Sequence, residues 1–281
     1  MKRSSAQLKQ LAREALNGKY GTFIGALVIY NILTFSISII ITLLLPGYPI
    51  TMFLVKYLVI FVFALFYAIL RAGMSYQALN TARKKDIAVG NLFYALSLHP
   101  DRFIIASLLI SLIGFPLGFI LGIGHFFLSY MRYSMLSIPV FSLLFIVMLI
   151  IVISILLRFA LCGFLLLDYP DMRATKALET SSKLMKGNKG RYFYLSLSFL
   201  GLFLLGILSV GVAFLWIIPY INATTAYFYL DVIGELDSKE NTPETENPTP
   251  MDGFSSYGGL DTDMFPPRTG NSYPNNLDDF R

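Results

Sequence analysis

Long apolar blocks alternate with shorter polar segments along this chain, and the blocks are long enough to be membrane-crossing helices. A helix needs about 20 apolar residues to cross the ~30 Å hydrocarbon core of a bilayer. The last block, residues 192–232, would be about 60 Å long as a helix, twice what one crossing needs, so we divide it near residues 209–211. The pattern predicts an all-α polytopic membrane protein with six spans, at about residues 22–45, 53–74, 103–123, 136–157, 192–209 and 212–232.

The polar segment at residues 1–20 has the apolar spacing of an amphipathic helix. Its apolar positions recur at i, i+3, i+4, i+7 and i+8, and they are Leu8, Leu11, Ala12, Ala15 and Leu16. Ser4 or Ser5 is expected to cap the start of this helix, and Gly18 is expected to end it. We expect the helix to lie at the cytosolic face of the membrane.

Two further amphipathic, interfacial helices are expected in the predicted cytosolic segments 75–102 and 168–191. In the second of these, Asp171 is the expected N-cap and Gly187 the expected stop. The charged stripe of that helix comprises Lys176, Glu179, Lys183 and Lys186.

Composition supports the membrane assignment. The 281 residues are 56% hydrophobic and 14% charged, with a mean hydropathy of +0.64. Soluble domains carry about 25% charged residues, so this chain has too few charges to cover a water-facing surface. The single cysteine, Cys162, cannot form a disulfide within the chain and is expected to be a buried apolar side chain.

The distribution of lysine and arginine predicts the orientation in the membrane. Fifteen of these residues fall in the segments 1–20, 75–102 and 168–191, against two, Lys56 and Arg132, on the opposite side. Because positive residues favour the cytosolic side, the sequence predicts a cell-membrane protein with a cytoplasmic N-terminus. Six spans place the C-terminus in the cytoplasm as well, whereas five would place it outside.

The last 49 residues differ from the rest of the chain. Residues 1–232 hold 19 basic and 7 acidic side chains, whereas residues 233–281 hold 3 basic and 10 acidic ones. The second segment is rich in Pro, Asn, Asp, Gly and Ser, which predicts a disordered acidic tail after the membrane domain of residues 21–232. The tail could be merely solvated, fold back on the basic face, or bind a cytosolic partner.

No pattern of residues that would support catalysis or cofactor binding is found. The two histidines, His99 and His125, form no HExxH or Cys/His cluster, and there is no G-x-S-x-G sequence. The stretch 187–190 lacks the full phosphate-loop pattern, and the topology explains the dispersed basic residues without nucleic acid. The sequence therefore predicts a non-enzymatic protein with no metal, cofactor or nucleic-acid partner.

The candidate binding residues are cations close to the cytosolic ends of the spans. Arg71 and Arg158 could extend their side chains to the interface, or they could line a pocket for lipid phosphate. Asp168 could pair with either arginine. The remaining candidates for binding lipid phosphate are Lys183, Lys186, Lys189 and Arg191. The expected partner is the bilayer with its anionic phospholipids, and small residues at four-residue spacing leave the oligomeric state open.

Several motifs match a known family pattern. They are Leu8-Lys-x-x-Ala12-Arg-x-x-Leu16-x-Gly18-x-Tyr20, Asp168-Tyr-Pro170, Ala177-Leu-x-x-Ser181, Leu184-Met-Lys-Gly187-x-Lys189 and Leu215-Trp-x-x-Pro219-Tyr220. Over most of residues 5–232 the chain resembles the bacterial integral membrane family called domain of unknown function 975. The resemblance implies a multi-pass bacterial membrane protein without an established activity. A weaker similarity to the membrane domain of some glycerophosphodiester phosphodiesterases brings none of their catalytic residues.

The sequence leads to one main functional hypothesis and two alternatives. The main one is a multi-pass protein that associates with anionic lipid and serves membrane organisation or a stress response. The first alternative is a transporter or exporter of a lipid-like or amphipathic molecule. The second is an adaptor that recruits a cytosolic partner through its tail.

Overall fold

The computed structural model describes residues 2–44, 50–97, 99–112 and 137–237, which fold into helices and short connections with no strand among them. The predicted all-α class is therefore confirmed. The elements are α1 (Ser5–Leu16), α2 (Tyr20–Leu44), α3 (Ile50–Ala82), the 3-10 helix η1 (Val89–Phe93), α4 (Tyr94–Ser97), α6 (Ser137–Arg158), α7 (Cys162–Asp168), α8 (Ala174–Leu184), α9 (Lys189–Leu197), α10 (Leu200–Leu208) and α11 (Phe214–Val232). A further helix covers Pro100–Leu112.

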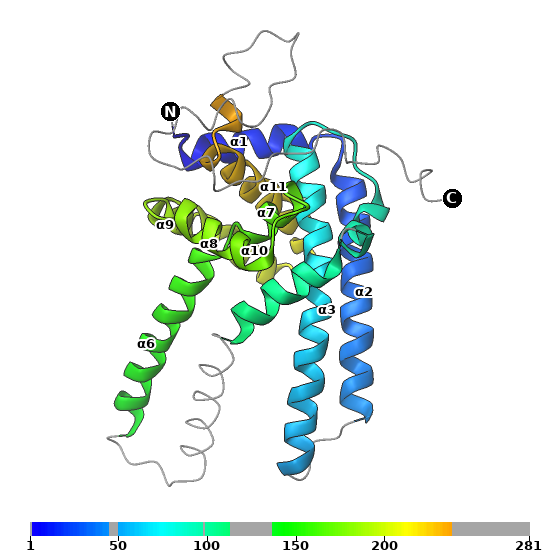
Figure 1. Cartoon of the computed structure of the whole chain (residues 1–281), viewed down its shortest axis with the longest axis vertical. Helices are drawn as coiled ribbons and strands as arrows, with labels where there is room; N and C mark the ends of the chain where they lie inside the picture. The colour runs from blue at the N-terminus through cyan, green and yellow to red at the C-terminus, as the bar shows by residue number, and fades with distance from the viewer. Residues whose placement is uncertain (1, 45–49, 98, 113–136, 238–281) are drawn as a thin grey trace.

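The helices form two regions (Figure 1). α1 and α7–α11 gather at one end of the molecule, which we call the helical body, while α2, α3 and α6 extend away from it. Large apolar side chains are exposed along these extensions, among them Leu43 and Leu44 on α2 and Leu143 and Ile150 on α6. Such continuous exposure of aliphatic side chains is unusual for a surface in water and is typical of helices that face lipid.

Four helical segments are long and apolar enough to cross a membrane. They are Tyr20–Leu44, Phe61–Ala82, Ser142–Asp168 and Lys189–Leu208. A fifth is added if Val89–Ser97 and Pro100–Leu112, which meet at 85°, form one broken span. The predicted number of six spans is therefore not confirmed for the described part of the chain. Residues 113–123 of the predicted third span lie outside the described residues.

Part of the difference arises in the last apolar block. Its predicted division near residues 209–211 is correct, since α10 ends at Leu208 and α11 begins at Phe214. α11 is nevertheless the central helix of the helical body, packed mainly against α1 and α3, with 12 of its 19 residues buried. α11 is not among the described helices that are apolar enough to cross a membrane, and protein also covers most of its apolar side chains.

α1 packs its predicted apolar face onto α11. Leu8, Ala12 and Leu16 are buried there, as the spacing predicts. The predicted start is also correct, because Ser4 and Gln7 exchange side-chain to backbone hydrogen bonds in a capping box. Since protein covers this face, an interfacial position of α1 on a bilayer stays a prediction.

α3 continues eight residues beyond the predicted second span (53–74), as far as Ala82. The added turns enter the helical body, where Gln77 and Thr81 are buried. Gly73 lies at the closest contact in this region, where an added Cβ would overlap the carbonyl oxygen of Leu92 and lie 2.5 Å from its carbonyl carbon. η1 therefore packs directly on the backbone of α3.

The ends of α8 agree only partly with the sequence-based expectation. The N-cap is Arg173, which makes no side-chain capping bond, so the prediction of Asp171 as the cap is wrong. The backbone N–H of Met172 instead bonds to the carbonyl of Tyr169 in a turn that precedes the helix. After α8, Gly187 has a φ of +83°, a conformation that glycine adopts without strain and that ends the helical path.

Candidate functional site

Residues 183–191, which we call the basic segment, run from the last turn of α8 into the first turn of α9 and carry most of the predicted binding residues. Lys183 and Lys186 are exposed and Lys189 is half-exposed. Lys183 forms an ion pair with Glu179 on the same helix, with 2.7 Å between Nζ and Oε1. Lys186 and Lys189 make no ion pair with any residue that the structure describes, so their positive charges face outward.

Arg158 and Arg71 approach this basic segment from two other helices. Arg158, exposed at the end of α6, donates from Nε to the Ser182 hydroxyl on α8 at 2.6 Å. Arg71, exposed on α3, interacts electrostatically with Tyr192 on α9. The two predicted arginines therefore lie beside α8 and α9 respectively, with no bonded partner in common among the described residues.

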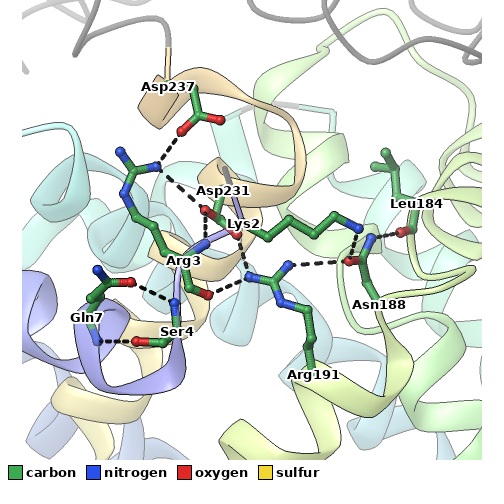
Figure 2. Close-up of polar contacts among 9 residues, drawn as sticks. All are labelled: Lys2, Arg3, Ser4, Gln7, Leu184, Asn188, Arg191, Asp231 and Asp237. Carbon is green, nitrogen blue, oxygen red and sulfur yellow. Dashed lines mark hydrogen bonds and ion pairs between the residues drawn. The ribbon is translucent and has the colours of Figure 1, made fainter.

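Arg191 differs from the other candidates because protein groups surround it (Figure 2). Its Nη2 donates to Asp231 Oδ2 at 2.6 Å and to the backbone carbonyl of Arg3 at 2.8 Å. Its Nη1 reaches Asn188 Oδ1 at 3.3 Å. The Asp231 side chain is only 1% exposed, and a carboxylate buried in this way is costly without a positive partner beside it. Arg191 thus serves the fold, which leaves the three lysines as the outward-facing charges of the segment.

The same contacts tie the start of the chain to the end of α11. The Arg3 backbone N–H donates to Asp231 Oδ1 at 3.2 Å, and Arg3 Nη1 donates to Asp237 Oδ1 at 2.9 Å. Lys2 Nζ donates to Asn188 Oδ1 at 3.0 Å. We call this group the terminal clasp; it comprises Lys2, Arg3, Asn188, Arg191, Asp231 and Asp237. Burial disfavours the Asp237 carboxylate, but the positive N-terminal groups, Arg3 among them, outweigh this and lower its pKa.

A second ion cluster lies inside the helical body. Arg83, just after α3, donates from both Nη atoms to Asp168 at 2.6 and 2.8 Å. Its Nε and Nη2 also reach Glu235 at 3.0 and 2.7 Å, and the Tyr229 hydroxyl donates to Asp168 at 2.8 Å. Burial opposes the charged guanidinium, but the two carboxylates outweigh it and raise the pKa of Arg83 well above its usual value. The Arg83 cluster thereby joins α3, α7 and α11.

The prediction that Asp168 pairs with Arg71 or Arg158 is wrong, because its carboxylate is bound by Arg83 and Tyr229. In the sequence analysis Arg83 is only one of the cations of segment 75–102 that predict the orientation in the membrane. A signal for the pairing was present, since Asp168 and Asp231 are acids at the ends of apolar blocks. A carboxylate in such a place is costly unless a cation lies beside it.

These contacts predict where the tail can be removed. The described fold continues to Asp237, past residue 233 where the sequence placed the start of the tail. A variant that ends after Asp237 retains both clusters and should keep its thermal stability. Removal of residues 235–281 deletes Glu235 and Asp237, one partner each of Arg83 and Arg3, while Asp168 and Asp231 remain. The loss of the part-buried hydrogen bonds from Arg83 to Glu235 should cost about 1–3 kcal/mol. Thermal unfolding of the two truncations in detergent would measure the difference, and equal melting temperatures would contradict it.

No group of three His, Cys, Asp or Glu side chains suited to hold a metal ion occurs within residues 2–44, 50–97, 99–112 and 137–237. The expected lack of a cofactor stays a prediction. The carboxylates best placed to act as ligands, Asp168 and Glu235, are occupied by Arg83. The acids of the two clusters therefore hold segments of the chain together, while the outer lysines remain as exposed positive groups.

Comparison with known proteins gives a family without an assigned activity. No curated protein and no solved structure matches the chain. One family model does match, over residues 1–235, a range that includes the helical body, the extended helices and Glu235 of the Arg83 cluster. The chain belongs to the family described as "Protein of unknown function (DUF975)".

Proposed function

We propose that this chain is a non-enzymatic, multi-pass protein of the cell membrane that binds the phosphate groups of anionic lipids through its basic segment. Both termini lie on the cytoplasmic side in this proposal, as the distribution of lysine and arginine favours. The bound lipid would serve membrane organisation or a stress response. The binding residues are Arg71, Arg158, Lys183, Lys186 and Lys189.

One observation carries the proposal: the buried acids of the helical body are bound by arginines, while the lysines of the basic segment lie at the surface. Of the nine acidic residues up to Asp237, the four in the two clusters are bound by arginines. The exposed charge beside α8 and α9 is therefore mainly positive. A lysine or arginine near an anionic leaflet contributes about 1 kcal/mol to binding of that leaflet.

The proposal predicts that an anionic phospholipid remains bound to the protein after gentle extraction and is lost from an Arg71→Gln/Arg158→Gln variant. Removal of two cations should weaken retention by about 2 kcal/mol, roughly 30-fold. Native mass spectrometry of the wild type and the variant, extracted from the same membrane, would measure the retained lipid and identify its class. A Lys186→Gln/Lys189→Gln variant should lose the lipid similarly.

The matched control is Lys84→Gln/Lys85→Gln. It removes the same charge from two exposed positions outside the basic segment, in the connection after α3. It should retain the lipid as the wild type does. Equal retention by the control and both test variants would show that lipid binding does not depend on these cations, and the proposal would then fail.

A further inference from the structure

The turn between α10 and α11 satisfies its own backbone hydrogen-bond donors. Every backbone N–H from Ser209 to Ile217 donates to an acceptor between residues 205 and 213. For Ala213 the acceptor is the hydroxyl of Ser209, and this hydroxyl in turn donates to the carbonyl of Gly206. Donors at a turn in water need no such internal partners, because water supplies them. In hydrocarbon, each donor without a protein acceptor is costly.

The side chains of this turn are also those of a lipid-facing segment. Leu208 is 80% exposed and Val210 is 93% exposed, and Val212 and Trp216 are more than half exposed. The sequence has no charged residue between Arg191 and Asp231. An exposed apolar hairpin tip of this kind is unfavourable in water and favourable among acyl chains.

Charged groups on α1 limit how far this hairpin can enter a bilayer. The Lys9 ammonium donates to the carbonyl of Ser198 at 2.9 Å and lies 4.2 Å from the centre of the Phe199 ring. The Arg13 guanidinium lies 5.6 Å from the centre of the Tyr220 ring. Charged groups are costly in the middle of a bilayer. The part of the hairpin beside Lys9 and Arg13, which we call the charged level, therefore belongs at or near the interface.

The two arms of the hairpin are in contact at that level. The rings of Phe199 and Tyr220 pack edge to face with their centres 5.4 Å apart, and those of Phe203 and Phe214 pack at 5.6 Å closer to the tip. Beyond the charged level lie only α10, with nine residues, and the first turns of α11. Nine helical residues reach about 14 Å, roughly half of the ~30 Å hydrocarbon thickness.

We propose that α10 and α11 form a re-entrant hairpin that enters the bilayer from the side on which α1 lies. Its tip at Val210 ends near the middle of the bilayer, and its exposed side chains contact acyl chains of one leaflet. Lys189–Leu208 has the length and composition of a span. To cross, however, it would have to bring the Lys9 ammonium to the membrane centre. This inference does not depend on the binding of lipid phosphate.

Spin labels at successive exposed positions would test the hairpin. The variants are Leu200→Cys, Leu204→Cys, Leu208→Cys and Val210→Cys, each in the full chain with Cys162→Ser and reconstituted in phosphatidylcholine–phosphatidylglycerol vesicles. All four side chains are more than half exposed, so a label should fit without repacking. Relative accessibility to oxygen and to a water-soluble nickel chelate measures the depth of each label. Lys186→Cys provides the water-exposed reference.

A re-entrant hairpin makes depth increase from Leu200 to Val210, with the Val210 label reached by oxygen and protected from nickel. A crossing helix reverses the gradient, because Leu200 would lie near the middle and Val210 at the far interface. That reversal would overturn the proposal. So would nickel accessibility at all four positions, which would place the hairpin in water. Four positions define the depth gradient. If one variant fails to fold, the remaining three still distinguish an increasing depth from a reversed one.

Discussion

Replacement of Arg83 by methionine is expected to destabilise the protein by about 3–5 kcal/mol, since removal of one partner of a buried ion pair has this effect. Methionine fills similar space but leaves Asp168, whose side chain is fully buried, and Glu235, 9% exposed, without the guanidinium that both contact. The Arg83 cluster joins α3, α7 and α11, so its loss should loosen the helical body as a whole. Unfolding in mixed micelles, followed by circular dichroism, would measure the change.

Two further variants distinguish loss of the charge from loss of the side chain. Arg158→Met makes the same replacement at an exposed site, where it loses one hydrogen bond to Ser182, and should destabilise the protein by only about 1 kcal/mol. Arg83→Lys keeps the charge but loses the paired donors, so it should fall between the two. If Arg83→Met proves as stable as Arg158→Met, the cluster does not stabilise the fold.

After Arg83→Met, Gly73→Ala is expected to lower the stability of the protein most among the single substitutions considered. The new Cβ would overlap the carbonyl oxygen of Leu92 and lie 2.8 Å from its Cα, and these are backbone atoms that cannot turn aside. Overpacking of this kind costs about 1–3 kcal/mol, and here η1 must move away from α3 to relieve it. We therefore expect a lower melting temperature and faster proteolysis within residues 83–97.

Gly163→Ala and Gly201→Ala are the matched controls for this prediction. Both glycines lie in helices, and a Cβ at either would meet no atom within 4 Å. Alanine is the better helix former by up to about 1 kcal/mol, so these changes should be neutral or stabilising. A Gly73→Ala protein as stable as these controls would contradict the close packing of η1 on α3.

The elements that the sequence predicts well are those whose pattern is local. The buried face of α1, its cap at Ser4 and the break between α10 and α11 all follow from spacing or from residues adjacent in the chain. The predicted spans at 22–45 and 136–157 agree closely with α2 and α6. Each of these features depends on positions a few residues apart, which is the range over which helical periodicity acts.

The elements that the sequence misses depend on contacts between distant segments. α3 is longer than predicted because the helical body buries polar residues in its last turns, such as Gln77. Hydropathy predicts only the apolar part of this helix. The partner of Asp168 lies 85 residues away along the chain, among several equally charged candidates. Among the candidate binding residues, Arg191 forms an ion pair with Asp231, which lies 40 residues further along the chain.

The terminal clasp has a consequence for the order of events during synthesis. Arg3 and Asp231 are 228 residues apart, so α1 leaves the ribosome long before α11, the helix that covers it. At about 5–20 residues per second this interval lasts roughly 10–45 s. Throughout that time Leu8, Ala12 and Leu16 lack α11, their main final partner, and of the helices with which α1 makes its main contacts only α3 is made early. The N-terminus is thus the first part of the protein to be made and among the last to reach its folded position.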